Sequence, residues 1–577
     1  MDLVFDIETD DLKATKVWCI VAQDVETNKI YQFPPDKLKE GVELLANADK
    51  LIGHNILGFD IPMVQKFFDV NLLTDKEILD TLVLSRLFNP TREGGHSLEK
   101  WGYKLGFQKI EFEDYLNYSE DMMKYCTRDV QLNTLVFKEL RKESKGFSKE
   151  SIYLEHEVAK VIKEQETNGF KFDDRYANLL LAELRERMQS IEDEVHKTFK
   201  PKWVDIKEVT PKFKKDGTLS KSGLTDCEFD RIKMTGDTKP FMRKQLQEFN
   251  LGSRKQIGEY LKEFGWKPDR FTPTGQPIVD EKTLSEITHI KEAKLIADFL
   301  LIQKRIAQVE SWVEAVEDDN RVHGFVIPNG AITGRMTHRN PNMAQVPSIN
   351  SEYGRECRSC WVVEDGNKLI GVDASGLEIR MLAHYMNDEE FTNDIINGDI
   401  HTSNQKSAGL KSRNQAKTFI YALMYGAGDE KLGKGGGGDS GDGKRARQHF
   451  FDNRPSFKSL GDRVKRAATK GYLKGIDGRK LYVRNAHAAL NTLLQGAGAI
   501  VMKQALVDLS KKLKLNLLKV KFVANIHDEW QLEVEEAKSE YIGMMAVESI
   551  VNAGKHFNLR CPLDGEYKIG GNWSETH

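Results

Sequence analysis

Short hydrophobic runs, several of them alternating with polar residues, predict strands near both ends of the chain. Residues 3–9 form the first run, and residues 369–373 form an apolar run that ends in an acid and leads into a helix. Residues 520–526 alternate, meet a short acidic turn, and alternate again at 531–534. This last pattern predicts a hairpin with carboxylates at its tip. Acidic side chains are therefore expected at strand ends in two separate parts of the chain.

Apolar residues spaced three and four apart predict long helices in the middle of the chain, at 176–199, 253–264 and 290–316. Residues 201–245 differ, because lysines, glycines and prolines interrupt the pattern. This stretch predicts a basic, partly irregular excursion between helices. It fits two roles equally well: a solvated loop, or a tip that grips the phosphates of a nucleic-acid duplex without reading its sequence.

The overall composition is that of a globular protein with several domains. The chain has 577 residues, of which 40% are hydrophobic and 30% charged, and no apolar run reaches the ~18 residues of a membrane span. Six cysteines are too few for a disulfide framework and fit a reducing cytoplasm. The acidic start of the chain runs directly into a strand, so we expect no targeting peptide and a cytoplasmic location.

The distribution of charge separates the chain into two parts. Residues 1–140 contain 16 Lys and Arg against 25 Asp and Glu, whereas the remainder contains 69 against 63. An acidic first domain joined to a mildly basic remainder indicates two different tasks. The net charge of −3 neither supports nor excludes nucleic-acid binding.

Three short acidic motifs follow one another in the first domain. Strand alternation places Asp6 and Glu8 on one face, where two carboxylates are unfavourable unless a cation lies between them. Alone, this pair is more simply explained as an acid-rich strand end. Asp60 supplies a third acid, and helical spacing puts Tyr125 and Asp129 one turn apart on the same side.

This order of Asp-x-Glu, Asn-x4-Asp and Tyr-x3-Asp resembles the DEDD family of 3′→5′ exonucleases, in its tyrosine-containing variety. The resemblance covers residues 1–140. It implies that Asp6, Glu8, Asp60 and Asp129 hold two Mg²⁺ ions, for which Mn²⁺ can substitute, and that Tyr125 orients the attacking water. We expect His54 to have a core or supporting role, and Asp80 to be a helix N-cap or a packing-associated polar group.

A second acid pair lies in the remainder of the chain. Asp373 is at the end of a predicted strand and Asp528 is at the tip of the predicted hairpin. Two such acids side by side form a suitable cradle for a pair of Mg²⁺ ions in phosphoryl transfer.

Between these acids, Arg413, Lys417, Tyr421 and Tyr425 recur every four residues and so line one face of a predicted helix. A surface helix with core tyrosines is the alternative. Such a helix more often carries its cations at the C-terminal end, where the helix dipole favours them. Cations at the N-terminal end are better explained by an anionic ligand, such as a triphosphate.

These segments resemble family A, the DNA polymerase I-like polymerases, and within it the T-seven-like bacteriophage branch. The supporting stretches are DASGLE at 373–378, GDIHT at 398–402, YGAGDEK at 425–431, HAALN at 487–491 and the ending GNW at 571–573. The resemblance extends over nearly all of residues 320–577.

The resemblance implies an α/β plus α+β architecture: a ribonuclease H-like exonuclease domain followed by a right-hand polymerase whose palm sheet is mostly antiparallel. The implied domains are the exonuclease domain at 1–150, the thumb at 151–320, the palm at 321–395 and 476–577, and the fingers at 396–475.

By the same resemblance, Asp373 and Asp528 are metal-binding catalytic acids, and the Ala374 carbonyl is a further ligand. Lys417 also protonates the leaving pyrophosphate, and Glu378 helps to exclude a 2′-hydroxyl group. Glu378 has a structural alternative, since Ser375-x-x-Glu378 is also a capping-box pattern. The residues implied in dNTP binding are His401, Arg413, Lys417, Tyr421 and Glu378.

The implied partners are primer-template DNA and dNTPs, with a phage helicase-primase and a single-stranded DNA-binding protein at the replication fork. Host thioredoxin as a processivity factor stays open, because the excursion at 201–245 looks short for the insertion that binds it in phage relatives. The residues implied in DNA contacts are Arg335, Gln345, Tyr425, His487, Asn491, Gln495 and His527.

Two other functions share some of these features. A single-subunit RNA polymerase has similar palm motifs, but the acidic trio and Glu378 argue against it. A DNA-binding scaffold with an inactive polymerase half is disfavoured by intact Asp373 and Asp528. Two further motifs are set aside: Cys357-x-x-Cys360 lacks a second cysteine pair for zinc, and the glycine-rich tract 433–443 predicts a flexible loop rather than a phosphate-binding loop.

Overall fold

The computed structural model describes residues 1–577, which form two compact units. One unit contains residues 1–173 and 315–577, and the other contains residues 174–314. The second unit is narrower than the range 151–320 expected for the thumb. Residues 149–168 form a helix that packs on elements of the first unit, and residues 170–172 join one of its sheets.

A five-stranded mixed sheet organises the N-terminal part of the first unit. Its order is β3-β2-β1-β4-β5, with β1 antiparallel to β2 and parallel to β4. The strands are β1 (Asp2–Thr9), β2 (Val17–Asp24), β3 (Ile30–Phe33), β4 (Lys50–Gly53) and β5 (Glu77–Asp80). The helices of this part are α1 (Leu38–Ala46), α2 (Asp60–Phe68), α3 (Thr81–Phe88), α4 (Leu98–Leu105) and α5 (Glu120–Glu143), with a 3-10 turn at Pro35–Lys37.

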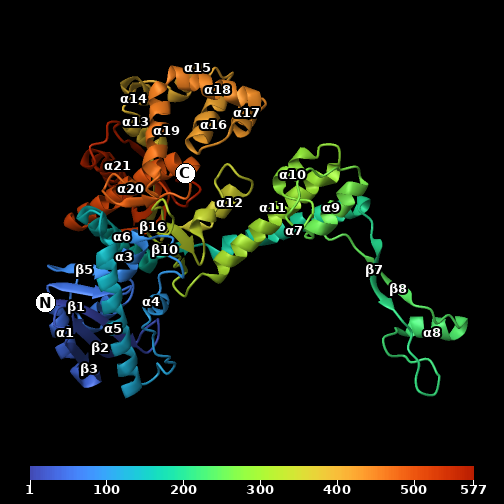
Figure 1. Cartoon of the computed structure of the whole chain (residues 1–577), viewed down its shortest axis with the longest axis horizontal. Coiled ribbons are helices and arrows are strands. Elements are labelled where there is room, and N and C mark those ends of the chain that lie inside the picture. The colour runs from blue at the N-terminus through green and yellow to red at the C-terminus, as the bar shows by residue number, and fades with distance from the viewer. The chain divides into compact units, whose positions relative to one another are not determined.

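Helices cover both faces of this sheet because β1 alternates two apolar sets. Leu3 and Phe5 pack with residues of α1 and α2, whereas Val4 packs with α5 on the opposite face. Figure 1 shows α1 and α5 flanking the blue strands. The centre of β1 is therefore fully buried, and the polar residues near its C-terminal end lie in a protected environment.

The second large sheet of this unit has four antiparallel strands, as expected for the palm. Its order is β16-β17-β13-β18, so that β13 lies between β17 and β18. Helices α6 and α21 pack against it, and α20 packs on both of these helices (Figure 1). The bounds are β13 (Asn367–Ala374), β16 (Val520–Ile526), β17 (Glu529–Glu535), β18 (Gly565–Gly570), α6 (Lys149–Asn168), α20 (Ala489–Leu515) and α21 (Ser539–His556).

A buried ion cluster joins three distant segments beside this sheet. Glu155 of α6 accepts hydrogen bonds from Lys503 of α20, at 2.7 Å, and from Arg479. Arg479 also pairs with Asp477 at 2.7 Å. All four side chains are almost completely buried, so their two positive and two negative charges neutralise one another inside the protein.

Residues 377–468 are mostly helical, and the glycine-rich tract that was expected to be a flexible loop contains the end of one helix, a short turn and the start of the next helix. That expectation is wrong, because Asp439 caps a helix with its side chain and the glycines allow close helix packing. A Cβ atom on Gly433 would lie 1.7 Å from the Asp439 carbonyl oxygen. The helices are α13 (Leu377–Met386), α14 (Glu389–Ile396), α15 (Ile400–Ala408), α16 (Arg413–Met424), α17 (Asp429–Gly435), α18 (Ser440–Asn453) and α19 (Pro455–Ala468).

Short elements complete this unit. They are β6 (Phe170–Phe172), β9 (Arg321–Val322) and β12 (Trp361–Val362) in one sheet, β10 (Phe325–Ile327) with β11 (Thr337–Arg339), β14 (Tyr472–Lys474) with β15 (Lys480–Tyr482), α12 (Gly354–Ser359), and 3-10 turns at Met343–Gln345, Ala486–Ala488 and Glu536–Lys538.

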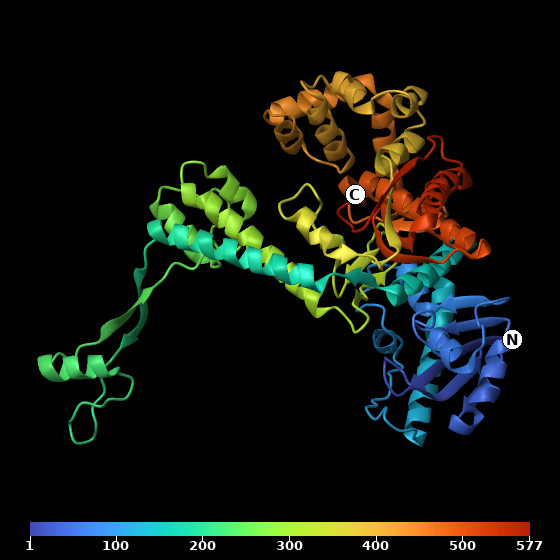
Figure 2. The same cartoon turned by 180° about the vertical axis from the view of Figure 1, so that it is seen from behind.

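In the second unit, the long helices α7 (Asp174–Thr198) and α11 (Lys291–Glu314) pack along each other, as Figure 2 shows. The smaller helices are α8 (Asp226–Thr235), α9 (Arg254–Glu263) and α10 (Glu281–Glu286). The excursion at 201–245 is more regular than expected, since β7 (Lys202–Val209) and β8 (Phe241–Gln247) pair as an antiparallel ribbon. The segment that connects these two strands contains α8. No helix anywhere in residues 1–577 combines the length and apolar character required to cross a membrane.

Candidate active sites

Four acids from three elements meet at the C-terminal end of β1. Strand alternation puts Asp6 and Glu8 on one face, as expected. Asp60 is the first residue of α2, and its Oδ1 atom accepts a 3.0 Å hydrogen bond from the Ile7 backbone N–H. Asp129 of α5 is close enough to raise the pKa of Asp6 by its charge.

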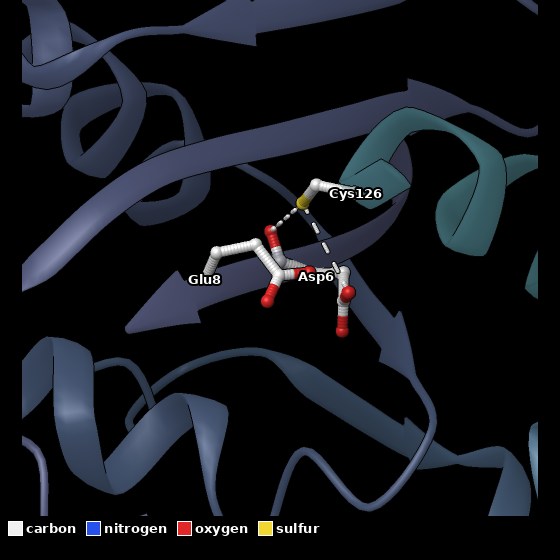
Figure 3. A group of neighbouring side chains, drawn as sticks. All are labelled: Asp6, Glu8 and Cys126. Carbon is white, nitrogen blue, oxygen red and sulfur yellow. Dashed lines mark hydrogen bonds between the residues drawn. The ribbon is translucent and has the colours of Figure 1, made fainter. Parts of the chain in front are cut away.

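A cysteine that the motif reading did not include completes this cluster. Ligand atoms of Asp6, Glu8 and Cys126 all lie within 4.8 Å of one another. Figure 3 shows the Cys126 thiol reaching from α5 toward Asp6, whose backbone oxygen lies 3.6 Å from Sγ. Burial raises the pKa of the Cys126 thiol, so it stays protonated and acts as a donor to Asp6. Its position next to Tyr125 in the motif is the only sequence signal for it.

The electrostatics of the cluster match a site for divalent cations. Burial raises the pKa of Asp6, Glu8 and Asp129, and it raises the pKa of Asp60 to about 7. The neighbouring carboxylates add to the shift of Asp6. In addition, Oδ1 of Asp129 is buried and has no hydrogen-bond partner. Hard oxygen donors in excess of local cations, one of them unpartnered, fit Mg²⁺ or Mn²⁺.

Tyr125 lies against the same cluster. Its ring stacks on Phe112 with centroids 5.4 Å apart, and burial followed by the Asp129 charge raises the pKa of its hydroxyl. Lys109, which the motifs did not indicate, pairs with Asp129 at 2.5 Å. The contact between Lys109 and Asp129 could not be predicted from the spacing of residues in the sequence, because the two residues belong to different segments.

Asp80 and His54 have the supporting roles expected of them. The Asp80 side chain caps α3 and also accepts hydrogen bonds from the backbone of Asn55 and Leu57, at 2.9 and 3.1 Å. It thereby shapes the turn that leads to Asp60. His54 bonds to Thr81 at 2.9 Å, and burial lowers its pKa to about 3.

The second acid pair lies where β13 meets the β16–β17 hairpin. The Ala374 backbone N–H donates to the Asp528 carbonyl oxygen at 3.2 Å, and Asp373 is paired with Glu529 across the strands. His527 at the hairpin tip has a φ of +59°, which is uncommon for a residue with a side chain. The structure thus brings Asp373 and Asp528 together, as the strand pattern predicted.

These two acids are also electrostatically strained. Burial, followed by the charge of Asp528, raises the pKa of Asp373 to about 7. Burial likewise raises the pKa of Asp528. Two carboxylates that resist ionisation in each other's presence are the donor set that a pair of divalent cations stabilises.

Glu529, in contrast, is held in its charged form by the C-terminal residues. Burial opposes its ionisation, but the hydrogen bond and charge of His577, the charge of Arg358 and the hydrogen bond from Trp573 together lower its pKa. The Trp573 indole donates at 2.6 Å, and His577 lies 3.0 Å away. Glu529 follows Asp528 directly in the sequence, but its contacts with the C-terminal residues could not be predicted from that position.

Glu378 lies at the centre of a small polar network. It accepts hydrogen bonds from Arg335 at 2.8 Å and from the Tyr425 hydroxyl at 2.5 Å. The capping-box alternative is wrong, since α13 is preceded by Gly376 with a φ of +58° and no side chain caps it. Glu378 is therefore directed toward Arg335 and Tyr425 rather than back to Ser375.

The cationic face of α16 forms as predicted. Arg413 and Lys417 are exposed in its first turns, and Arg413 pairs with Asp399 at 2.6 Å. His401 lies near both. Burial and then the positive charges of these two side chains lower the pKa of its imidazole. The His401 ring is 6.4 Å from that of Tyr421.

The residues expected at primer-template DNA come from several elements of this unit. Tyr425 follows the last helical residue of α16, so the predicted helix face ends there. A Cβ atom on the next residue, Gly426, would lie 2.6 Å from the His487 carbonyl oxygen. The others are placed as follows: Arg335 and His527 are close enough to interact electrostatically, Gln345 ends a 3-10 turn, and Asn491 and Gln495 are half-buried on α20.

Known proteins resemble the chain over its whole length. The model of DNA polymerase family A matches residues 232–575. The DNA-directed DNA polymerases of Enterobacteria phage T3 and Escherichia phage T7 are 33% and 32% identical, with 100% of both chains covered. DNA polymerase I of Aquifex aeolicus is 25% identical over 94% of this chain and 99% of its own.

The fold is also that of a solved polymerase structure. The POL domain of Pol1 from M. smegmatis, in complex with DNA primer-template and dNTP, superimposes with a TM-score of 0.80 at 19% identity, covering 100% of this chain and 96% of that chain. Full-length similarity to the phage enzymes and the family match over residues 232–575 lead to one conclusion: the chain is a member of DNA polymerase family A, close to the T7-like phage enzymes.

Proposed function

We propose that the chain is a DNA-directed DNA polymerase that extends a primer on a template by two-metal phosphoryl transfer at Asp373 and Asp528. The observation that carries this proposal is the pairing of β13 with the β16–β17 hairpin, which juxtaposes two half-buried carboxylates. The phage relatives named above act as DNA-directed DNA polymerases, and the donor set fits Mg²⁺, for which Mn²⁺ can substitute.

Each residue has a role that follows from its place. Asp373, Asp528 and the Ala374 carbonyl would hold the metal ions, which when bound supply charge stabilisation to the attacking and leaving oxygens. Arg413 and Lys417 form a cationic group at the N-terminal end of α16, and His401 of α15 lies near both; the three side chains would bind the triphosphate. Lys417 would also give a proton to the leaving pyrophosphate.

The sugar of the incoming nucleotide would lie between Tyr421 and Glu378. Burial followed by the Glu378 charge raises the pKa of Tyr421, so the two side chains are close together. With Glu378 fixed by Arg335 and Tyr425, a 2′-hydroxyl group would meet a carboxylate that is already bonded. This arrangement supports a preference for dNTPs over rNTPs.

Primer extension with Asp373→Asn tests the polymerase proposal. Loss of a metal ligand should cost several kcal/mol of transition-state stabilisation, or about 10³-fold in rate. Asp365→Asn, at an exposed acid just before β13, is the matched control and should extend normally. Unchanged synthesis by Asp373→Asn, or preferential use of rNTPs by the unmodified protein, would contradict the assignment.

We infer a second activity, 3′→5′ exonuclease, at the N-terminal cluster. It is supported by the convergence of Asp6, Glu8, Asp60 and Asp129 and by the unpartnered Oδ1 of Asp129. Tyr125, one turn from Asp129, would orient the water. Replacing Asp6 and Glu8 together by alanine should abolish 3′ degradation and spare primer extension; persistent degradation would place the nuclease elsewhere.

The β7–β8 ribbon is the segment at which a processivity factor would bind this chain. Trp203, Met242 and Leu246 are exposed on it, as a surface for DNA or for a protein such as thioredoxin would be. However, the alignments with the phage relatives span 704 and 709 positions, more than the 577 residues here, so the relatives contain segments that this chain lacks. Equal product lengths with and without thioredoxin would dismiss this dependence. A helicase-primase and a single-stranded DNA-binding protein remain predicted partners.

A further inference from the structure

Lys109 is an internal cation of the N-terminal acid cluster. It lies in the segment between α4 and α5, and its ammonium nitrogen is 2.5 Å from Oδ2 of Asp129. The same nitrogen lies 4.9 Å from the centre of the Tyr125 ring. The charges of Asp6 and Glu8 also act on it. Lys109 therefore contacts two residues of the proposed exonuclease site and faces two more.

The pair differs from ordinary surface ion pairs on the same helix. Lys109 and Asp129 have side-chain exposures of 25% and 6%, whereas Lys124 and Asp121 in α5 have 69% and 77%. Removing two charges from water is costly and is not in itself a source of stability. The exposed pair of Lys124 and Asp121 is solvated, so its presence costs little. The burial of Lys109 and Asp129 must serve a purpose other than stability.

Anchoring the segment is not that purpose, because other contacts already hold it on α5. The Arg128 guanidinium donates to the Gln108 carbonyl oxygen at 2.8 Å and lies 3.5 Å from the Phe107 ring centre. Phe112 stacks on Tyr125. Lys109 is thus carried into the site by a segment that stays in place without its ion pair.

The bonding of Asp129 shows what Lys109 does. One carboxylate oxygen bonds to Lys109, while the other, Oδ1, is buried without a partner. A carboxylate that binds a metal with one oxygen commonly has its other oxygen fixed by a neighbouring donor, which orients it. We propose that Lys109 is a positioning residue of the exonuclease centre: it fixes Oδ2 of Asp129 so that Oδ1 is left for a divalent cation.

This inference rests on the proposed exonuclease function. It is tested with Lys109→Met, Lys109→Arg and the matched control Lys124→Met in the full-length chain. The first readout is single-turnover removal of a 3′ nucleotide from a single-stranded oligonucleotide. The second is Mn²⁺ binding, followed by the electron paramagnetic resonance of free Mn²⁺ in an Asp373→Asn background, which removes a ligand of the other centre.

Lys109→Met should weaken Mn²⁺ binding or slow nucleotide removal by about 10- to 100-fold, as is usual when the outer partner of a ligand is lost. Lys109→Arg should recover most of both, because it restores the cation, and Lys124→Met should change neither. With Asp373 intact, primer extension should be the same for all three variants, which shows that the chain is folded.

Two results would overturn the role of Lys109. One is an unchanged rate and Mn²⁺ affinity in Lys109→Met; the other is tighter Mn²⁺ binding, which would make Lys109 a competitor of the metal. Failure of the exonuclease proposal itself would look different from these two results. In that case the unmodified protein and Asp129→Asn would degrade the 3′ end equally, or neither would degrade it.

Discussion

Replacing Glu155 by glutamine should strongly destabilise the unit formed by residues 1–173 and 315–577. Glu155 is 1% exposed and accepts hydrogen bonds from both Lys503 and Arg479. At the 2.7 Å separation of Lys503 and Glu155, an effective dielectric constant of about 20 gives an attraction of about 6 kcal/mol. Much of this attraction only offsets the free-energy cost of removing the two charged groups from water. Removing one partner leaves an uncompensated buried charge, so we expect a net loss of about 3–5 kcal/mol.

A double-mutant cycle with Lys503→Met measures the interaction. Glu155→Gln with Lys503→Met leaves the pair of Arg479 and Asp477, so the net charge of the cluster returns to zero. The double variant should therefore lose less than the sum of the single losses, by at least about 1 kcal/mol. Urea unfolding monitored by hydrogen exchange of α6 and α20 amides provides the free energies and reports on this unit alone.

The matched control is Glu164→Gln on the same helix, where the ion pair with Lys514 is largely exposed. It should change the free energy of unfolding by less than about 1 kcal/mol. The reasoning is refuted if Glu155→Gln is no more destabilising than this control, or if the Glu155 and Lys503 changes are additive. Either result would mean that the four charges do not depend on one another.

Three further predictions concern other parts of the chain. The hydrogen bond from Arg243 lowers the pKa of Glu228 to about 2. The stability that this ion pair adds to the β7–β8 ribbon should therefore be present above about pH 4.5 and be lost as the pH falls toward 2. Amide exchange in β7 and β8 as a function of pH measures this loss. Gly433→Ala should lower the melting temperature, because its Cβ would meet a backbone oxygen, whereas Gly461→Ala, where nothing lies within 4 Å, should raise stability by up to about 1 kcal/mol. Glu378→Ala should reduce the preference for dNTPs over rNTPs by about tenfold or more, since the 2′-hydroxyl group would no longer meet a carboxylate that is already bonded, a contact that costs about 1–3 kcal/mol; single-nucleotide incorporation kinetics with both substrates measures this ratio.

Features that depend on local periodicity could be predicted from the sequence. Asp6 and Glu8 share a strand face because side chains alternate, and Tyr125 and Asp129 share a helix face because they are four residues apart. The position of Asp528 at a hairpin tip followed from two alternating runs with a short turn between them. In each case the pattern lies within one element or two adjacent ones.

Features that depend on distant contacts or on the context of a glycine could not be predicted. Lys109 pairs with Asp129 only after the segment before α5 folds back on that helix. Glycines in 433–443 suggested flexibility, yet Gly433 is required for close helix contact. Similarly, Gly376 takes a positive φ and starts α13 without a side-chain cap, so the Ser375–Glu378 pattern has no capping role.

The two acid clusters share one physical problem and differ in how the protein meets it. In both, burial raises the pKa of carboxylates that must be ionised to bind a metal. The N-terminal cluster contains its own cation, Lys109, bonded to one of the acids. Asp373 and Asp528, in contrast, lie in no ion pair; Arg335, which is near them, is committed to Glu378. The cations of α16, which we propose to bind the triphosphate, form no ion pair with these acids; Arg413 pairs with Asp399 instead. At the proposed polymerase centre most of the charge compensation would therefore come from bound metal ions, whereas at the proposed exonuclease centre a lysine bonded to one of the acids supplies part of it.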